Sequence, residues 1–251
     1  MAVYERLYLS CIDEQAPRLA KEYDLGLEIT RYTWSPMMVD KSSKAFVKAQ
    51  MAASNRFWFH APFAELTPCA IDPLVRELSM KRYLQAAAIA KKFGINRMVL
   101  HGGFIPQVYY PEWFVEKSVE FWRKFLKAAP SGMEFVLENV FEPSPDLLVR
   151  VVAQLEAPNV GLCLDLGHAL LTDVPLEKWL DDTMPFLHHV HIHNNDGKTD
   201  LHLPPDDGIG DMTECLHRIC DESSATITLE SQDSLKSLIW FLHNSHTGGN
   251  L

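Results

Sequence analysis

Short apolar runs alternate along the chain with longer stretches of helical spacing. The runs are rich in β-branched and aromatic residues, as buried strands are, whereas the longer stretches repeat apolar residues every three or four positions. Between 111 and 129, for example, Val115, Val119, Trp122 and Leu126 fall on one helical face. The pattern therefore predicts strands and helices in regular alternation.

Eight strands and eight helices are predicted in this way. The strands cover residues 6–12, 25–30, 56–60, 97–101, 134–139, 160–165, 188–194 and 225–230. The helices cover residues 13–23, 42–53, 72–93, 111–129, 145–156, 175–184, 211–222 and 234–244. Eight such units in 251 residues are typical of an α/β protein built as a closed (β/α)8 or TIM barrel, which usually needs about 250 residues.

We therefore expect a single TIM-barrel domain over residues 1–251, with only the last few residues, around the Gly-Gly-Asn stretch 248–250, frayed. A doubly wound open sheet is the alternative. The Gly-x-Gly-x-x-Gly fingerprint of a nucleotide-binding sheet is absent from the sequence, which disfavours that alternative.

Six consecutive predicted strands end on a histidine or a carboxylate. These residues are His60, His101, Glu138, Asp165, His193 and Glu230. The carboxyl ends of the strands surround the mouth of a barrel, where the active sites of this fold lie. Charged groups that converge there need a compensating cation, and imidazole with carboxylate is a ligand set of zinc, manganese and cobalt. A lone strand-end histidine is more often solvated than ligating, but six agreeing strand ends predict a metal site.

Three local spacings add to this prediction. His191 and His193 share one face of their strand, since side chains two apart point the same way, and we favour His193 because it lies nearer the carboxyl end. Asp165 and His168 are separated by a turn that contains glycine. Asp200-Leu201-His202 places a carboxylate and an imidazole on one side of an extended segment, within a polar loop over the barrel mouth.

Charge and composition restrict the possible partners. The chain has 23 basic and 33 acidic residues, a formal charge of −10, and no cluster of lysines and arginines. Proteins that grip nucleic acid usually present a basic face, so a nucleic-acid partner is not expected. No apolar run approaches the ~20 residues of a membrane span, and the N-terminus lacks the pattern of a secretory signal. With five scattered cysteines, we expect a cytoplasmic protein without disulfides and without a membrane partner.

Three motifs carry a resemblance to a known family. They are Glu138-Asn139, the segment from Cys163 to His168, and the segment from His191 to Gly197 that runs on to Asp200-Leu201-His202-Leu203-Pro204. In this order they resemble the xylose-isomerase-like TIM-barrel superfamily. That superfamily includes sugar and sugar-phosphate isomerases and epimerases, related dehydratases, and the endonuclease IV nucleases. The resemblance extends over nearly the whole chain, from Gly26 to Ser231.

The resemblance implies a ligand set and a number of ions. In the epimerase branch one catalytic divalent metal is held at the positions of Glu138, Asp165, His193 and Glu230. In the endonuclease branch two further metals are held, with Glu138 bridging, at the positions of His60, His101, His168, Asp200 and His202. One to three ions of zinc, manganese, cobalt or magnesium are therefore expected. Asp206 stands where family members often have glycine, a departure that bears on loop shape and on phosphate binding.

The leading functional hypothesis is a metal-dependent isomerase or epimerase of a small sugar, sugar phosphate or polyol. Glu138 and Glu230 would move a proton between neighbouring carbons through an enediolate, and His168 would steady the oxyanion. A dehydratase shares this first step and stays open as an alternative.

A second alternative is a zinc phosphoesterase of the endonuclease IV type. The number of ligands supports it and the negative charge opposes it. A third, a non-catalytic binding protein, is disfavoured because no ligand is missing. The expected partner is a small carbohydrate, and homo-oligomer formation is left open.

Overall fold

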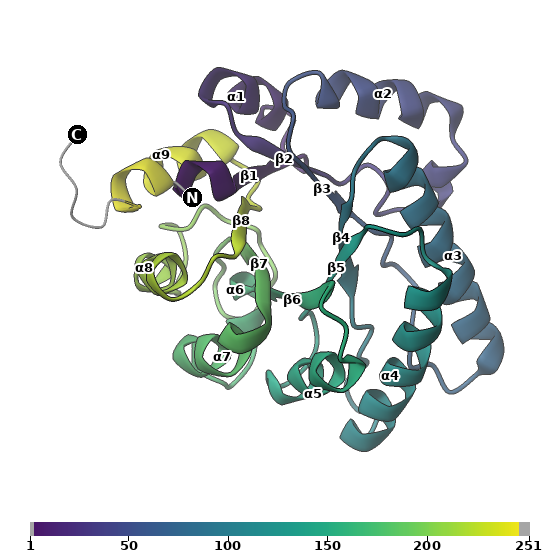
Figure 1. Ribbon diagram of the computed structural model, residues 1–251. Coiled ribbons are helices and arrows are strands. Elements are labelled where there is room, and N and C mark those ends of the chain that lie inside the picture. The colour runs from purple at the N-terminus through teal and green to yellow at the C-terminus, as the bar shows by residue number, and fades with distance from the viewer. Residues whose placement is uncertain (1–2, 246–251) are drawn as a thin grey trace.

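The computed structural model describes residues 3–245 and shows a closed barrel of eight parallel strands in chain order, ringed by helices (Figure 1). The strands are β1 (Leu7–Ser10), β2 (Gly26–Ile29), β3 (Phe57–His60), β4 (Arg97–His101), β5 (Glu134–Glu138), β6 (Val160–Asp165), β7 (Leu187–Ile192) and β8 (Thr226–Leu229). Strand β8 pairs in parallel with β1, which closes the barrel. The predicted TIM barrel is confirmed. The extent of the domain over residues 1–251 stays a prediction, since the stretch 248–250 lies outside the described residues.

Each predicted helix is present, with its ends shifted by a few residues. They are α1 (Ala16–Tyr23), α2 (Lys41–Met51), α3 (Pro73–Lys92), α4 (Pro111–Ala128), α5 (Asp146–Leu155), α7 (Leu176–Thr183), α8 (Met212–Glu222) and α9 (Ser234–Asn244). Several begin at an aspartate whose carboxylate accepts a backbone N–H of the first turn, as Asp72 does for α3 and Asp233 for α9.

Four short elements were not predicted. They are the helical turn α6 (Leu166–Ala169) and the 3₁₀ turns η1 (Val3–Arg6), η2 (Ser35–Met38) and η3 (Met184–Phe186). A single turn is too short to show helical periodicity in a sequence.

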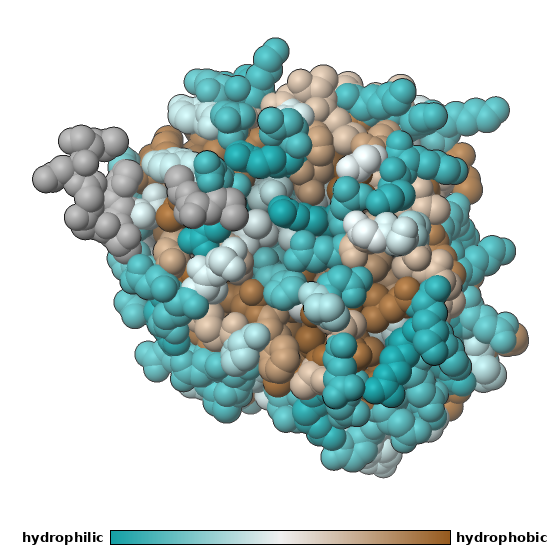
Figure 2. Space-filling view, in the orientation of Figure 1, coloured by the Kyte–Doolittle hydropathy of each residue, from teal (hydrophilic) through white to brown (hydrophobic). Residues whose placement is uncertain are grey.

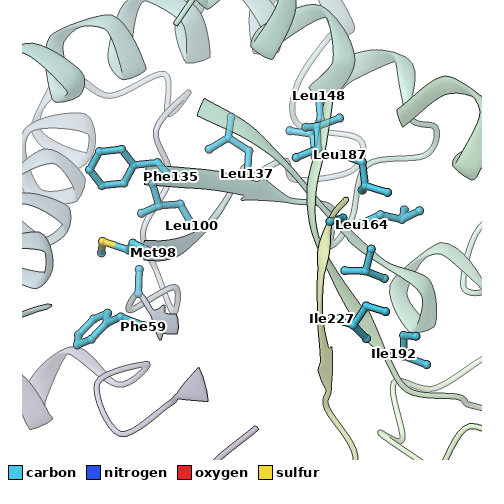
Figure 3. Close-up of a cluster of buried hydrophobic side chains, with 14 of the residues drawn as sticks. Phe59, Met98, Leu100, Phe135, Leu137, Leu148, Leu164, Leu187, Ile192 and Ile227 are labelled. Atoms are coloured by element: carbon cyan, nitrogen blue, oxygen red, sulfur yellow. The ribbon is translucent and has the colours of Figure 1, made fainter. Parts of the chain in front are cut away.

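The strands separate two apolar clusters. Side chains on their outer face pack against the helices; Figure 3 shows ten labelled members of this cluster, among them Phe59, Met98, Leu137 and Ile192. The second cluster fills the inside of the barrel and consists of Tyr8, Trp58, Val99, Val136 and Cys163.

Each member of the inner cluster stands two positions before a polar strand-end residue. Those residues are Ser10, His60, His101, Glu138 and Asp165. Since side chains two apart on a strand share a face, the strand-end side chains also point into the barrel, one level nearer its mouth.

In the view of Figure 2, hydrophilic side chains cover much of the surface formed by the described residues, and hydrophobic patches lie between them. None of the helices within residues 3–245 is both long and apolar enough to cross a membrane. Localisation in the cytoplasm stays a prediction.

Candidate metal centre

The first group of metal-ligating side chains comes from three neighbouring strands. His60, His101 and Glu138 end β3, β4 and β5, and the register places His101 beside Glu138. The Nε2 atoms of His60 and His101 lie 3.3 and 3.1 Å from the same carboxylate oxygen of Glu138, Oε2. A single oxygen therefore faces two imidazole nitrogens in a buried position.

The second group shares Glu138 with the first. Nδ1 of His191 lies 3.4 Å from Oε1 of Glu138, 3.5 Å from Oδ2 of Asp165 and 2.9 Å from Oε2 of Glu230. The opposite nitrogen of this ring, Nε2, lies 3.1 Å from Oε2 of Glu28, deeper in the barrel. Three carboxylates and one imidazole nitrogen thus converge on one point.

The third group lies across the mouth, on the segments that follow β6 and β7. Oδ2 of Asp200 lies 3.2 Å from Nε2 of both His168 and His202. His193 stacks on His202 with ring centroids 4.0 Å apart, and its Nε2 lies 3.0 Å from Oδ1 of Asp165. In each of the three groups the candidate ligand atoms lie within 4.8 Å of one another.

A local network fixes the turn between β6 and α6. The backbone N–H of His168 donates to Oδ1 of Asp165 at 2.7 Å, and the side-chain amide of Asn139 bonds both the N–H and the C=O of Asp165. Gly167 faces the ring of His193 so closely that an added Cβ would lie 2.0 Å from its Cε1. The glycine foreseen at this turn is therefore required by the packing of His193.

The loop from 194 to 210 is tied to the barrel by two asparagines. The buried amide of Asn194 donates to the carbonyls of Pro205 and Gly210, at 2.7 and 2.9 Å. Asn195 donates to the carbonyl of Gly167 at 2.7 Å. These bonds span the loop that carries Asp200 and His202, so both side chains are held in place by groups at its base.

Several histidines of the centre gain positive charge from the carboxylates beside them, whereas burial lowers the pKa of His101. Burial opposes charge on His60, but the adjacent Glu138 outweighs it and raises the pKa of His60 to about 9. Burial likewise opposes charge on His168, but Asp165 and Asp200 raise its pKa to about 10. Asp200 likewise raises the pKa of His202 to about 9.

The carboxylates show the complementary shifts. Burial alone would raise the pKa of Glu138, but His101 and His191 hold it well below its ordinary value. The pKa values of Asp165 and Glu230 are lowered in the same way, against burial, by neighbouring histidines. Anionic oxygens and cationic rings therefore balance one another at the mouth.

The donor set fits divalent cations. Nε2 of His101, Oε2 of Glu138, Nδ1 of His191 and Nδ1 of His193 are buried, and although other candidate ligand atoms lie close to them, none of the four makes a hydrogen bond of good geometry. Buried polar atoms without such a bond are costly, and an ion coordinated by them would remove that cost. Oxygen and imidazole ligands together suit zinc, manganese or cobalt.

The groups open on a cavity of about 640 Å³ at the carboxyl ends of the strands. His60, His101, Glu138, His168, Asp200, His202 and Glu230 line it. Asp165, His191 and His193 lie behind them and are fully buried. The cavity therefore gives a small molecule access to the lining residues of the ligand set, whereas Asp165, His191 and His193 form the buried base of the centre.

All nine residues predicted as metal ligands lie at the mouth of the barrel, but the structure places one of them differently from the prediction. His191, not His193, stands among Glu138, Asp165 and Glu230, whereas His193 contacts Asp165 and lies 3.8 Å from Oδ1 of Asp200. The choice of His193 as ligand stays a prediction. The sequence showed that the two rings lie on the same face of the strand, but it did not show how far each lies along the barrel axis.

Two residues outside the nominated set also occupy special positions. Glu28 is fully buried and accepts hydrogen bonds at one oxygen from His189, His191 and Thr228. Glu142 is buried with Oε1 unpartnered, and burial raises its pKa. Asp206, the departure from the family pattern, is exposed and lies 3.7 Å from Nζ of Lys236.

The fold and the three ligand groups define the class of protein as a (β/α)8 barrel with a candidate metal centre at its mouth. Residues 18–240 match the family described as xylose isomerase-like TIM barrel, and the chain belongs to that family.

The chain is 27% identical over 193 residues to the uncharacterized protein MJ1311 of Methanocaldococcus jannaschii, and the match covers 71% of this chain and 66% of that protein. Among solved structures, the TTHB071 protein from Thermus thermophilus, soaked with ZnCl2, is 25% identical. Its TM-score is 0.75, with 98% of this chain and 100% of that chain covered. A D-tagatose 3-epimerase-like protein shares the fold, with TM-score 0.79 and 19% identity over 95% of this chain and 97% of that one.

Proposed function

We propose that this chain is a metal-dependent isomerase or epimerase of a sugar or related polyol. The observation that carries the proposal is the position of Glu138 and Glu230. Both carboxylates line the cavity, from β5 and from the end of β8, and both lie within 3.4 Å of the same nitrogen of His191. Two bases thus face a substrate position from different sides. The family membership and the epimerase-like structural relative support this assignment.

The carboxylates suit proton transfer between neighbouring carbons. The lowered pKa values of Glu138 and Glu230 keep both groups ionised at neutral pH, so either can accept a proton. Ser10 donates a hydrogen bond to Oε1 of Glu230 at 3.4 Å, and Nδ1 of His202 lies 2.9 Å from the Glu230 carbonyl, which together hold this glutamate. One glutamate would remove a proton beside a carbonyl, and the same glutamate would return it to the adjacent carbon. Delivery to the opposite face would come from the other glutamate after that group takes up a proton from solvent in the cavity.

A divalent ion bound by Glu138, Asp165, Glu230 and one histidine of β7 or its end would supply Lewis-acid polarisation of the substrate oxygens. In the metal-free protein Asp165 and Asp200 raise the pKa of His168 to about 10, against burial, so the ring carries a proton at neutral pH. The protonated ring, which lines the cavity, would donate a hydrogen bond to a developing oxyanion. Proton removal followed by loss of hydroxide would make the reaction a dehydration.

Phosphoester hydrolysis is a second candidate, favoured by the two further ligand groups. His60 with His101, and His168 with Asp200 and His202, offer positions for additional ions beside the one at Glu138. Several ions close together suit hydrolysis because they stabilise both the attacking and the leaving oxygen. In this reading His168 is a ligand and cannot act as a proton donor.

Solvent-proton exchange tests the first proposal. Metal-loaded protein would be incubated with a panel of ketopentoses and ketohexoses in deuterium oxide, and deuterium at carbon would be followed by NMR. We expect exchange in the unchanged protein and its loss in Glu138→Gln and in Glu230→Gln. Full exchange in both variants would contradict the assigned roles, and no exchange with any sugar would contradict the reaction class.

Metal content and hydrolysis separate the second candidate from the first. Elemental mass spectrometry on protein purified without chelators would give the number of ions per chain. Two or three zinc ions with chelator-sensitive cleavage of bis(p-nitrophenyl) phosphate would support hydrolysis. One ion per chain and no cleavage at high protein concentration would remove it.

A further inference from the structure

One side of the cavity is apolar. Five consecutive loops, those after β1 to β5, each place a large hydrophobic side chain on its wall. We call these residues the apolar arc: Ile12, Trp34, Phe63, Ile105 and Phe141. All are exposed, with Trp34 and Phe141 at 64% and 62% of their full accessibility. Single exposed apolar residues are ordinary, but five around one opening mark a binding surface.

The other side of the same cavity is polar. The segments after β6, β7 and β8 contribute His168, Asp200, His202 and Glu230 to its lining. The segments after β6 to β8 thus present hydrogen-bonding groups opposite the apolar arc, while His60, His101 and Glu138 line the cavity from the ends of the strands that precede the arc loops.

The apolar arc reaches the metal centre at one point. The ring of Phe63 stacks on His101 with centroids 4.5 Å apart and planes 14° from parallel. Phe63 also meets the edge of His60 at 5.8 Å. Phe63 is thus partly covered by protein, whereas Trp34 and Phe141 keep most of their surface free for a ligand.

Within residues 3–245, no lysine or arginine lines the cavity. Its ionisable lining residues are histidines and carboxylates, including Glu65 on the same side as the apolar arc. A phosphate or carboxylate placed away from the ions would find no basic side chain to pair with, and an unpaired anion in an apolar setting is costly.

We propose that the substrate is an amphiphile that joins a polyhydroxylated or carbonyl head to an uncharged aryl or alkyl group lying on the apolar arc. The placement of the head at the metal centre rests on the proposed function, whereas the apolar group of the substrate is inferred from the arc alone. A substrate that carries a further phosphate away from the ions is disfavoured, because that phosphate would face the arc or Glu65.

Hydroxamates test the tail preference without knowledge of the substrate, because their two oxygens chelate a divalent ion whatever tail they carry. Acetohydroxamate, hexanohydroxamate, benzohydroxamate and succinate monohydroxamate would be titrated calorimetrically into zinc-loaded protein. We expect hexanohydroxamate and benzohydroxamate to bind at least about tenfold more tightly than acetohydroxamate, through burial of apolar area. The anionic succinate probe should bind no more tightly than acetohydroxamate.

Matched variants assign the preference to the arc. Trp34→Ala and Phe141→Ala should lose most of the gain for the apolar tails while their acetohydroxamate affinity stays unchanged. Leu74→Ala, which removes a similarly exposed apolar side chain on α3 outside the cavity, should keep the full gain.

Several outcomes overturn the proposal. Equal affinity for all tails does so, as does a preference for the anionic tail. Sedimentation would reveal a second copy on the arc: association that Trp34→Ala and Phe141→Ala abolish, with the tail preference unaltered, makes the arc a contact between copies. Absence of binding by every probe contradicts the zinc site and this proposal together. If only the proposed function is wrong, carbon-bound protons will not exchange with solvent, but the preference for apolar tails will persist.

Discussion

Glu28 and His191 form a fully buried pair, with Oε2 of the glutamate 3.1 Å from Nε2 of the imidazole. This contact directs the other ring nitrogen, Nδ1, toward Glu138, Asp165 and Glu230. A carboxylate behind a histidine fixes its tautomer and its orientation, and thereby supports a metal ion on the far side of the ring.

Replacement of Glu28 by glutamine should therefore weaken the metal centre. We expect zinc affinity to fall about 10- to 100-fold, measured by competition with a chromogenic chelator. Glu134→Gln is the matched control, because Glu134 starts β5 and bonds His188 away from the centre. An unchanged affinity in Glu28→Gln would argue that His193 alone supplies the imidazole of the second group.

Substitution of Gly167 by alanine should displace the ring of His193. The added Cβ would lie 2.0 Å from Cε1 of that ring, and such overpacking costs about 1–3 kcal/mol. The measurement is urea unfolding of Gly167→Ala, His193→Ala and the double variant. If the clash is the cause, the effects are strongly non-additive, and Gly167→Ala costs little once His193 is gone. Additive effects would place the strain elsewhere.

The metal-free protein should lose stability as pH rises above neutrality. The pKa values of His60 and His202 are raised to about 9 and that of His168 to about 10, above the unfolded value of about 6.5. The stabilisation from these protons is complete below about pH 6.5 and is lost as pH rises through 9 to 10. Thermal unfolding of chelator-treated protein between pH 6.5 and 10 should show a falling Tm. A Tm that holds steady across this range would contradict the charged state of the rings.

Removal of the Asn194 amide should loosen the loop that carries Asp200 and His202. Its Nδ2 donates to two carbonyls, and its Oδ1 accepts the N–H groups of Asn195 and Gly210. Asn194→Ala leaves these buried groups unpaired, at about 1–3 kcal/mol for each group not rescued by water. Urea unfolding should show the loss, and fewer zinc ions should bind per chain. Asn159→Ala, which deletes one bond from an exposed residue to the Met133 carbonyl, should change little; an equal loss there would contradict the prediction.

The fold was predictable because each level of the sequence agrees with it. Short apolar runs and helical spacing indicate the same alternation, and aspartates such as Asp72 cap the helices where that spacing begins. The short turn α6 was not predictable, because its four residues are fixed by the carboxylate of Asp165 and the packing of Gly167 rather than by a periodic pattern.

The residues of the candidate metal centre could be predicted from the sequence, but their arrangement around one another could be predicted less well. The carboxyl ends of barrel strands surround the mouth, and His60, His101 and Glu138 could be named because each is a metal-ligating residue type at such an end. Depth along the barrel axis depends on the stagger between strands, including the register shift between Leu162 and Cys163. The partners of His191 and His193 therefore could not be read from the sequence, and neither could the apolar arc, whose members come from five separate loops.

The inner apolar cluster of Tyr8, Trp58, Val99, Val136 and Cys163 closes the barrel from below. A metal ion and any ligand of the cavity would consequently share one entrance. A ligand seated in the cavity stands between the ion and the solvent, so it also sets how quickly a chelator can remove that ion. Residence of the ligand and retention of the metal are thus kinetically linked by the shape of the barrel.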